Sequence, residues 1–198
     1  MFPRQVQNLI NELSKLPDIG PRAATRLVFY LLSRDQFELN NLSNLIQNIK
    51  KNSCLCSQCF NVTDNNNSLC YVCRDKNRQQ GIICIVENLL NIIPIEKTKQ
   101  YNGLYHVLGG LISPVNGKGP EHIKIQELIN RIKKDQNIIE IILALSPTTE
   151  GDTTALYIER LLKDYPIKIS RLARGLSTGS DMEYVDENTL TNALRNRK

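Results

Sequence analysis

Apolar residues in the first 53 positions recur every three or four residues, which is the spacing of amphipathic helices. We expect Pro17 to end the first helix and Pro21 to begin the second, because proline suits the first helical position but not the interior. The pattern predicts an all-helical segment over residues 1–53, too short to bury a generous core alone. The apolar-periodic stretches are residues 6–16, 24–32 and 39–49.

From residue 80 the pattern changes to short apolar runs that alternate with longer amphipathic stretches. Such runs predict strands, and we expect the first and third to be buried on both faces. The helical stretches between them predict crossover connections, and therefore an α/β domain with a mostly parallel sheet. A final helix is predicted after Asp186, a suitable N-cap. The expected strands are residues 82–86, 105–108, 138–145 and 167–173, and the expected helices between them are residues 89–98, 121–134 and 152–163.

Two C-x-x-C pairs, ten residues apart, lie between these two regions. Each pair can offer two thiolates from one tight turn, so together they can supply the four sulfur ligands of a tetrahedral zinc site. The polar segment between the pairs cannot bury a core and would need the metal to stay ordered. We therefore predict one structural, non-catalytic Zn²⁺ per chain, bound by Cys56, Cys59, Cys70 and Cys73.

Disulfides and redox-active pairs are the alternatives to zinc. Residues 1–5 lack the basic start, apolar core and cleavage site of a secretory signal, which disfavours an oxidising compartment. Redox C-x-x-C pairs usually occur singly. Cys54 lies close enough to compete as a ligand, but the symmetric spacing favours leaving it out, and Cys84 is expected to be a small buried hydrophobe. No apolar run reaches membrane-spanning length, so we expect a cytoplasmic protein.

The net charge of +5 is concentrated near the N-terminus. Residues 1–53 carry seven Lys and Arg against four Asp and Glu, and residues 54–80 carry three against two. Residues 81–198 are nearly balanced, with fifteen against fourteen. If the chain binds a polyanion, we expect it to do so through the first 80 residues.

Residues 16–27 form a tight turn between two predicted helices, with Gly20 at the start of the second. The free amides and the helix dipole at such a start can hold a phosphate oxygen. Arg22 and Arg26 are four residues apart and share a helix face. The segment resembles the helix-hairpin-helix motif, which grips the nucleic-acid backbone without reading bases, although Asp18 stands where that motif usually has its first glycine. The alternative is a helix corner with solvated arginines.

Glu87 follows an apolar strand, at the end where open parallel sheets place their sites. A glutamate there, with an Asp-x-Asp after a second buried strand, is the metal-binding arrangement of the Toprim fold of topoisomerases, primases and nucleases. Here the second strand ends in residues 146–148 (Ser-Pro-Thr), and Glu150 and Asp152 fall at the next helix start, where acidic residues are favoured as caps. The segment looks like a Toprim domain with a broken metal site, which disfavours phosphodiester chemistry.

The whole set of motifs resembles the RecR family of bacterial recombination mediators over nearly the full length. Two further positions depart from the family pattern: Asn88 stands where an acidic residue is common, and Ser146 where asparagine is usual. The motifs after the helical hairpin are Cys56-x-x-Cys59-Phe60-Asn61-x-Thr63, Cys70-x-x-Cys73-x-Asp75, Ile85-Val86-Glu87, Gly103 through Gly110, Pro147-Thr148-x-Glu150-Gly151 and Arg174-Gly175-Leu176.

The resemblance implies a multidomain α+β protein. Its expected parts are a helix-hairpin-helix domain (1–53), a four-cysteine zinc finger (54–76), a Toprim-like domain (80–175) and a C-terminal helical tail (176–198). It implies a DNA-binding repair protein, not an enzyme, that works with RecO and RecF to help load RecA on gapped DNA. It also implies a homo-oligomer, a dimer or tetrameric ring, that acts as a ring or clamp.

Residue roles follow from the same resemblance. Gly20, Arg22 and Arg26 would contact DNA, the four cysteines of the two pairs would bind zinc, and Glu87, Glu150 and Asp152 would form an acidic patch facing a partner. Two other classes remain open. The chain could be an active Toprim nuclease or primase-like enzyme that uses these three carboxylates, or a zinc-ribbon adaptor that never touches nucleic acid.

Overall fold

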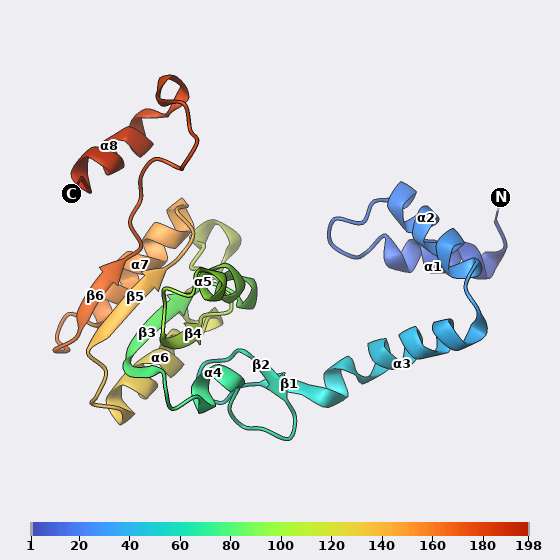
Figure 1. Cartoon of the computed structure of the whole chain (residues 1–198), viewed down its shortest axis with the longest axis horizontal. Coiled ribbons are helices and arrows are strands. Elements are labelled where there is room, and N and C mark those ends of the chain that lie inside the picture. The colour runs from blue at the N-terminus through green and yellow to red at the C-terminus, as the bar shows by residue number, and fades with distance from the viewer. Residues whose placement is uncertain (1, 198) are drawn as a thin grey trace. The chain divides into compact units, whose positions relative to one another are not determined.

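The computed structural model of the chain describes residues 2–197 (Figure 1). The chain divides into two compact units, residues 1–53 and residues 54–198. The first unit is helical, and the second carries the four-stranded sheet together with the four paired cysteines. Across residues 2–197, no helix combines the length and the apolar character that crossing a membrane requires.

The first unit consists of α1 (Arg4–Leu13), α2 (Pro21–Leu32) and α3 (Gln36–Asn52). The three predicted helices are therefore present, and Pro21 occupies the first position of α2 as expected. Asp35 caps α3, since its carboxylate accepts the Glu38 amide at 2.8 Å. The core of this unit is small, as expected for its length: it consists of Ile10, Ala24 and Val28, with Val6, Leu13 and Ile19 packed around them.

The predicted end of the first helix at Pro17 was wrong, because α1 ends at Leu13. The Lys15 and Leu16 amides then bond to carbonyls three residues back, at 3.1 Å each, which is the tighter turn common at helix ends. The residue before a proline is disfavoured in helical conformation. Pro17 therefore stops the helix upstream of itself rather than at its own position.

The second unit is built on a parallel sheet of four strands in the order β4-β3-β5-β6, drawn side by side in Figure 1. The pairing is parallel at each of the three interfaces, as the sequence pattern predicted. Val86 pairs with both Val107 and Ala144, so three strands end at the same level. The strands are β3 (Gln79–Val86), β4 (Gly103–Val107), β5 (Glu140–Ala144) and β6 (Lys168–Arg171).

Helices connect these strands in the predicted order. In the sheet order β4-β3-β5-β6, the connection from β3 to β4 moves toward the β4 edge. The connections from β4 to β5 and from β5 to β6 move the other way, toward the β6 edge. Because such crossovers are right-handed, α5 covers one face, and α6 and α7 cover the other. The connecting helices are η1 (Leu89–Asn91), α5 (Ile92–Thr98), η2 (Pro114–Asn116), η3 (Pro120–His122), α6 (Ile125–Lys134) and α7 (Thr149–Leu161).

The cysteine segment and the C-terminal tail complete the second unit. The cysteine segment contains the two-stranded sheet of β1 (Ser53–Leu55) and β2 (Val62–Asp64), followed by α4 (Tyr71–Arg74). The tail contains η4 (Met182–Tyr184) and α8 (Glu187–Arg195). Asp186 caps α8 as predicted, since its carboxylate accepts the Thr189 amide at 3.0 Å.

The burial of the strands differs from the prediction. The last four residues of β3 are buried, but the expected burial of β5 on both faces was wrong: Glu140 and Ile142 stay partly exposed. Glu140 instead pairs with Lys168 of the edge strand β6 at 3.0 Å. The other edge strand, β4, is buried along its whole length. The cysteine segment covers it, and the Val107 amide donates to the Cys59 carbonyl at 2.9 Å.

Candidate metal centre and nucleic-acid interface

The turn between α1 and α2 is closed by one backbone hydrogen bond and one left-handed residue. The Ile19 amide donates to the Leu16 carbonyl at 3.2 Å. Asp18 has a φ of 61°, in the left-handed region that glycine enters most readily and aspartate better than most other residues. Asp18 therefore supplies a left-handed residue at the position where a helix-hairpin-helix motif usually has glycine.

The first turn of α2 has no side-chain cap. Gly20 is the N-cap residue and Pro21 has no amide hydrogen, so the first backbone bond of the helix runs from Ala24 to Gly20 at 3.0 Å. The Arg22 and Ala23 amides have no partner within residues 2–197. A methyl group added at Gly20 would meet no atom within 4 Å. This helix start can therefore receive an anion from outside the chain.

The Arg22 and Arg26 side chains are exposed on the first two turns of α2. Neither forms an ion pair within the described part of the chain, where Lys15 and Arg34 of the same unit do. The structure thus brings the three predicted DNA-binding residues, Gly20 with the two arginines, to one end of one helix. Two unpaired guanidinium groups beside unpaired amides suit a run of phosphates rather than an acidic side chain of the protein itself.

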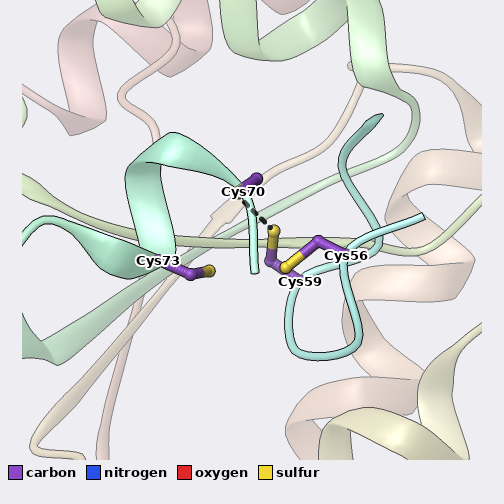
Figure 2. A group of neighbouring side chains, drawn as sticks. All are labelled: Cys56, Cys59, Cys70 and Cys73. Atoms are coloured by element: carbon purple, nitrogen blue, oxygen red, sulfur yellow. Dashed lines mark hydrogen bonds between the residues drawn. The ribbon is translucent and has the colours of Figure 1, made fainter. Parts of the chain in front are cut away.

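The four paired cysteines meet as predicted (Figure 2). Cys56 and Cys59 lie in the turn between β1 and β2, which we call the first knuckle (residues 56–59). The Cys56 amide donates to the Asn61 carbonyl at 2.7 Å and the Phe60 amide to the Cys56 carbonyl at 3.0 Å, which fixes this turn. Cys70 is the N-cap of α4 and Cys73 lies inside that helix, so a second rigid element presents the other two sulfurs.

The geometry of these sulfurs fits a tetrahedral metal ion. All four ligand atoms lie within 4.8 Å of one another, and all four side chains are buried. Bonds of about 2.3 Å to a tetrahedral zinc ion would place the sulfurs about 3.8 Å apart. The Sγ atom of Cys54 lies outside this group, 3.7 Å from the Asp64 carbonyl, and the thiol of Cys84 is buried in β3. The cysteines are all free thiols, so no disulfide competes for the ligands.

The protonation of the cysteine centre (Cys56, Cys59, Cys70 and Cys73) also favours a cation. The hydrogen bond with Cys59 lowers the pKa of Cys70 to about 2, so this thiol ionises readily. The hydrogen bond with Cys70 raises the pKa of Cys59. A hydrogen bond between Cys73 and Cys59 raises the pKa of Cys73. Without a cation these three close thiols compete for ionisation, because neighbouring thiolates repel each other. A divalent ion removes this conflict, because all four sulfurs can then be thiolates.

The three predicted acidic residues lie near the carboxyl ends of β3 and β5, but they do not converge. Glu87 follows β3 and accepts a hydrogen bond from the Ser146 hydroxyl, which follows β5, at 2.9 Å. Glu150 and Asp152 lie in the first turn of α7. Within residues 2–197, the cysteine centre is the only group whose ligand atoms come close enough to hold a metal ion.

Two arginines neutralise Asp152. Arg174 donates to it from both terminal nitrogens, with Nη1 at 3.0 Å from Oδ2, and Nη1 of Arg171 lies 3.3 Å from Oδ1. The Arg174 guanidinium holds the pKa of Asp152 below its usual range, despite some burial. Arg171 also contacts Glu159 at 2.7 Å. The Asp152 carboxylate is therefore occupied by protein cations.

No role was predicted for Arg131, Arg171 or Arg174 from the sequence. Arg131 lies on the buried side of α6 with Ile125, Leu128 and Ile132. A basic residue inside this apolar stripe was the one signal that could have singled it out. Arg171 and Arg174 reach Asp152 from β6 and the segment after it, about twenty residues along the chain. The sequence pattern of α7 alone therefore cannot predict that these two arginines contact Asp152.

Known proteins match all parts of the chain. Family models match residues 6–50 (RecR, helix-hairpin-helix), 81–173 (Toprim domain) and 175–198 (RecR, C-terminal). The recombination protein RecR of Tropheryma whipplei strain Twist is 44% identical over 198 residues, which cover 100% of this chain and 98% of that protein. The chain belongs to the RecR family. RecR of Staphylococcus aureus strain MRSA252 is 45% identical over 196 residues, covering 99% and 98% of the two chains, and RecR of Amoebophilus asiaticus is 45% identical over 192 residues, covering 97% and 94%.

Membership of the RecR family fits the geometry of both units. The RecR helix-hairpin-helix model covers the turn that holds Asp18 and Gly20, and the Toprim model covers the parallel sheet with its neutralised Asp152. The cysteine centre lies between these two matches, inside the full-length alignments with the RecR relatives. The expected fold class, with helical hairpin, cysteine segment, Toprim-like sheet and C-terminal tail, is confirmed.

Proposed function

We propose that this RecR family member is a DNA-binding protein of recombinational repair that grips the DNA backbone without reading its sequence. The observation that carries the proposal is the open start of α2, where the Arg22 and Ala23 amides have no partner among the described residues 2–197 and Gly20 leaves free space. The exposed Arg22 and Arg26 side chains extend this start along one helix. The family models and the names of the relatives, all recombination proteins, support the same role.

We infer the finer function from membership of the RecR family. The protein works with RecO and RecF to help RecA load on gapped DNA, as a ring or clamp formed by two or four copies. Glu87, Glu150 and Asp152 form the surface that meets a protein partner; each is partly exposed at the carboxyl end of the sheet. Six free thiols suit a reducing compartment, so the protein acts in the cytoplasm.

The protein acts without catalysis of its own. The two-arginine contact of Asp152 supports this, because that carboxylate is paired with protein cations and is not a free Mg²⁺ ligand, and Glu87 accepts a hydrogen bond from Ser146. The test is to incubate the purified chain with Mg²⁺ and labelled gapped DNA or nucleotides. No cleavage or incorporation is expected. Turnover that the Glu87→Gln substitution abolishes would show an active Toprim enzyme instead.

The cysteine centre binds one structural Zn²⁺ per chain. The mutual approach of four buried sulfurs supports this, and bound zinc would supply a cross-link between the first knuckle and α4, with no open coordination position for a substrate. Metal analysis of reduced, dialysed protein tests the assignment, with one zinc per chain expected. A folded protein that contains no zinc contradicts it.

DNA binding is tested with a matched pair of double substitutions. Arg22→Ala with Arg26→Ala removes two charges at the start of α2, and Lys50→Ala with Lys51→Ala removes two exposed charges at the end of α3. Binding to gapped DNA is measured at several salt concentrations, with and without RecO. The arginine pair is expected to lower the slope of log K against log salt by about 2. The lysine pair should change it less.

The possible outcomes distinguish direct phosphate contact at α2 from a diffuse charge effect and from a protein that does not bind DNA. Loss of binding in the arginine variant, with an unfolding curve like that of the parent, supports phosphate contact at α2. Equal losses in both variants would indicate a diffuse charge effect. Unchanged binding of the arginine variant at low salt would remove Gly20, Arg22 and Arg26 from the interface. If the parent protein bound no DNA at any salt concentration, with or without RecO, the result would favour an adaptor that does not touch DNA.

A further inference from the structure

Arg131 is a buried cation with an unused donor. Its side chain lies in α6 and is 9% exposed, and Nη1 donates to the Tyr105 carbonyl at 2.7 Å. Nη2 is buried and has no hydrogen-bond partner. Arg131 also has no ion-pair partner among residues 2–197. A buried guanidinium without a counter-charge is strongly unfavourable, and arginine cannot escape by losing its proton.

The free edge of β4 places this guanidinium beside the first knuckle. The Leu108 amide bonds toward β3, to the Val86 carbonyl, and alternate residues of a strand point their backbone groups to opposite sides. The Tyr105 carbonyl and the Val107 amide therefore share the free edge. Arg131 fills the first and the Cys59 carbonyl fills the second, two residues or about 7 Å further along the strand.

Two other observations agree with this placement. A surface cavity is lined jointly by Ser57, Gln58 and Phe60 of the knuckle region and by Arg131 of α6. Burial lowers the pKa of Arg131, and Cys73, Cys59 and Cys56 when ionised, together with Asp135, oppose this shift. The Asp135 carboxylate is itself engaged by the amide of Asn137 at 3.1 Å. Glu127 lines the same cavity but pairs with Lys124 at 3.3 Å, and both Glu127 and Asp135 are partly exposed. The cysteine centre is therefore the buried group on this side of Arg131 that can carry negative charge.

Charge balance suggests a role for Arg131 beside the cysteine centre. Four thiolates around one divalent ion leave two negative charges uncompensated in a buried site. We propose that Arg131 is the counter-ion of the metal-loaded cysteine centre, that its free Nη2 donor serves the thiolates, and that retention of the metal depends on it. This inference rests on the proposed zinc occupancy. Arg131 acts as a positioning residue, because it supports the ligands without binding the ion.

The test compares zinc affinity in full-length variants by competition with a chromogenic chelator. Arg131→Gln removes the charge, Arg131→Lys retains it, and Lys133→Gln removes an exposed charge from the same helix as a control. Arg131→Gln is expected to weaken zinc binding by about ten- to hundred-fold. Arg131→Lys should lose less than about ten-fold, and Lys133→Gln should match the parent. The sulfur-to-metal charge-transfer bands of the cobalt-loaded protein should shift in Arg131→Gln only.

A second measurement needs no substitution and covers the case in which the Arg131 variants do not fold. In the parent protein loaded with a spin-active cadmium isotope, the Arg131 Nη protons should exchange slowly and couple to the metal through the thiolate. Arg131 protons that exchange as fast as those of surface arginines would overturn the proposal.

Failure of the inference and failure of the zinc assignment are distinguishable. A parent that binds zinc, with an Arg131→Gln variant of equal affinity, overturns the role of Arg131 alone. Equal losses in Arg131→Gln and Arg131→Lys would also overturn the charge argument. A folded parent that binds no zinc overturns both.

Discussion

Arg174 holds the Asp152 carboxylate through both terminal nitrogens of its guanidinium. The pair joins the segment after β6 to the first turn of α7. Both side chains are more than a third exposed, at 36% and 39%, so solvent screens their attraction. The contact therefore removes a potential Mg²⁺ ligand while contributing only modestly to stability.

The stability that this pair contributes should depend on pH in one direction. Because its pKa in the folded chain is lowered from 3.8, Asp152 favours folding above that value, and the contribution disappears as the pH falls through the lowered pKa. We expect Arg174→Ala to lower the free energy of unfolding at pH 7 by about 1 kcal/mol or less. Urea unfolding at several pH values measures this.

The difference between parent and Arg174→Ala should shrink toward zero in acid. Arg160→Ala, an exposed change in the same helix α7, is the control and should match the parent at each pH. A difference that grows on acidification would contradict the assigned pairing.

Loss of one ligand should release the metal and destabilise the second unit. Cys73→Ser removes a sulfur of the cysteine centre, and Cys54→Ser removes a thiol of the same segment that lies outside it. We expect bound zinc to fall from one per chain to none in Cys73→Ser, with a loss of several kcal/mol of unfolding free energy, because metal binding is here part of folding. Metal analysis and urea unfolding of both variants check this. Zinc retained by Cys73→Ser, or lost by Cys54→Ser, would place the ligands elsewhere.

Gly20→Ala should separate DNA binding from folding. The φ of Gly20 is −76° and a methyl group there has open space, so the free energy of unfolding should change by less than about 0.5 kcal/mol. The same methyl group would occupy the approach of a phosphate to the Arg22 amide. Retention of gapped DNA is therefore expected to fall several-fold, and retention equal to that of the parent would show that phosphate does not approach this backbone.

The negative charge of Asp18 should weaken DNA binding, while its left-handed backbone conformation is needed for the turn between α1 and α2. Asp18→Asn removes the carboxylate and keeps a residue that tolerates the φ of 61°. Asp18→Gly removes the carboxylate and the left-handed strain together. Both variants should bind gapped DNA more tightly than the parent, with the largest gain at low salt. Asp18→Ala, which tolerates this φ less well, should instead be destabilised, and weaker binding by Asp18→Asn would contradict the electrostatic argument.

Much of the fold could be predicted from local patterns. The spacing of Cys56, Cys59, Cys70 and Cys73 alone indicated the metal centre, because ligand spacing within two tight turns is a local property. The alternation of strands and helices indicated the parallel sheet, and the capping role of Asp186 was evident from its position before an apolar-periodic run. The predicted boundaries of the cysteine segment, Toprim-like part and tail stay predictions.

The remainder depended on contacts between distant residues. The end of α1 at Leu13 was missed because the proline restriction acts upstream of Pro17. The full burial of β4 could not be predicted from its own residues, since Cys59, more than forty positions earlier, covers its edge. The arginines that contact Asp152 and the Tyr105 carbonyl were missed for the same reason.

The hydrogen bond from Val107 to Cys59 also has a consequence for handling the protein. β4 is a terminal strand of wholly buried residues, and its outward backbone groups are satisfied by the first knuckle and Arg131. Stripping or oxidising the cysteines would loosen that cover and present an apolar strand with unpaired amides to neighbouring molecules. Bare strands of this kind join to each other, so chelator-treated protein should turn turbid through intermolecular strand addition before it unfolds completely.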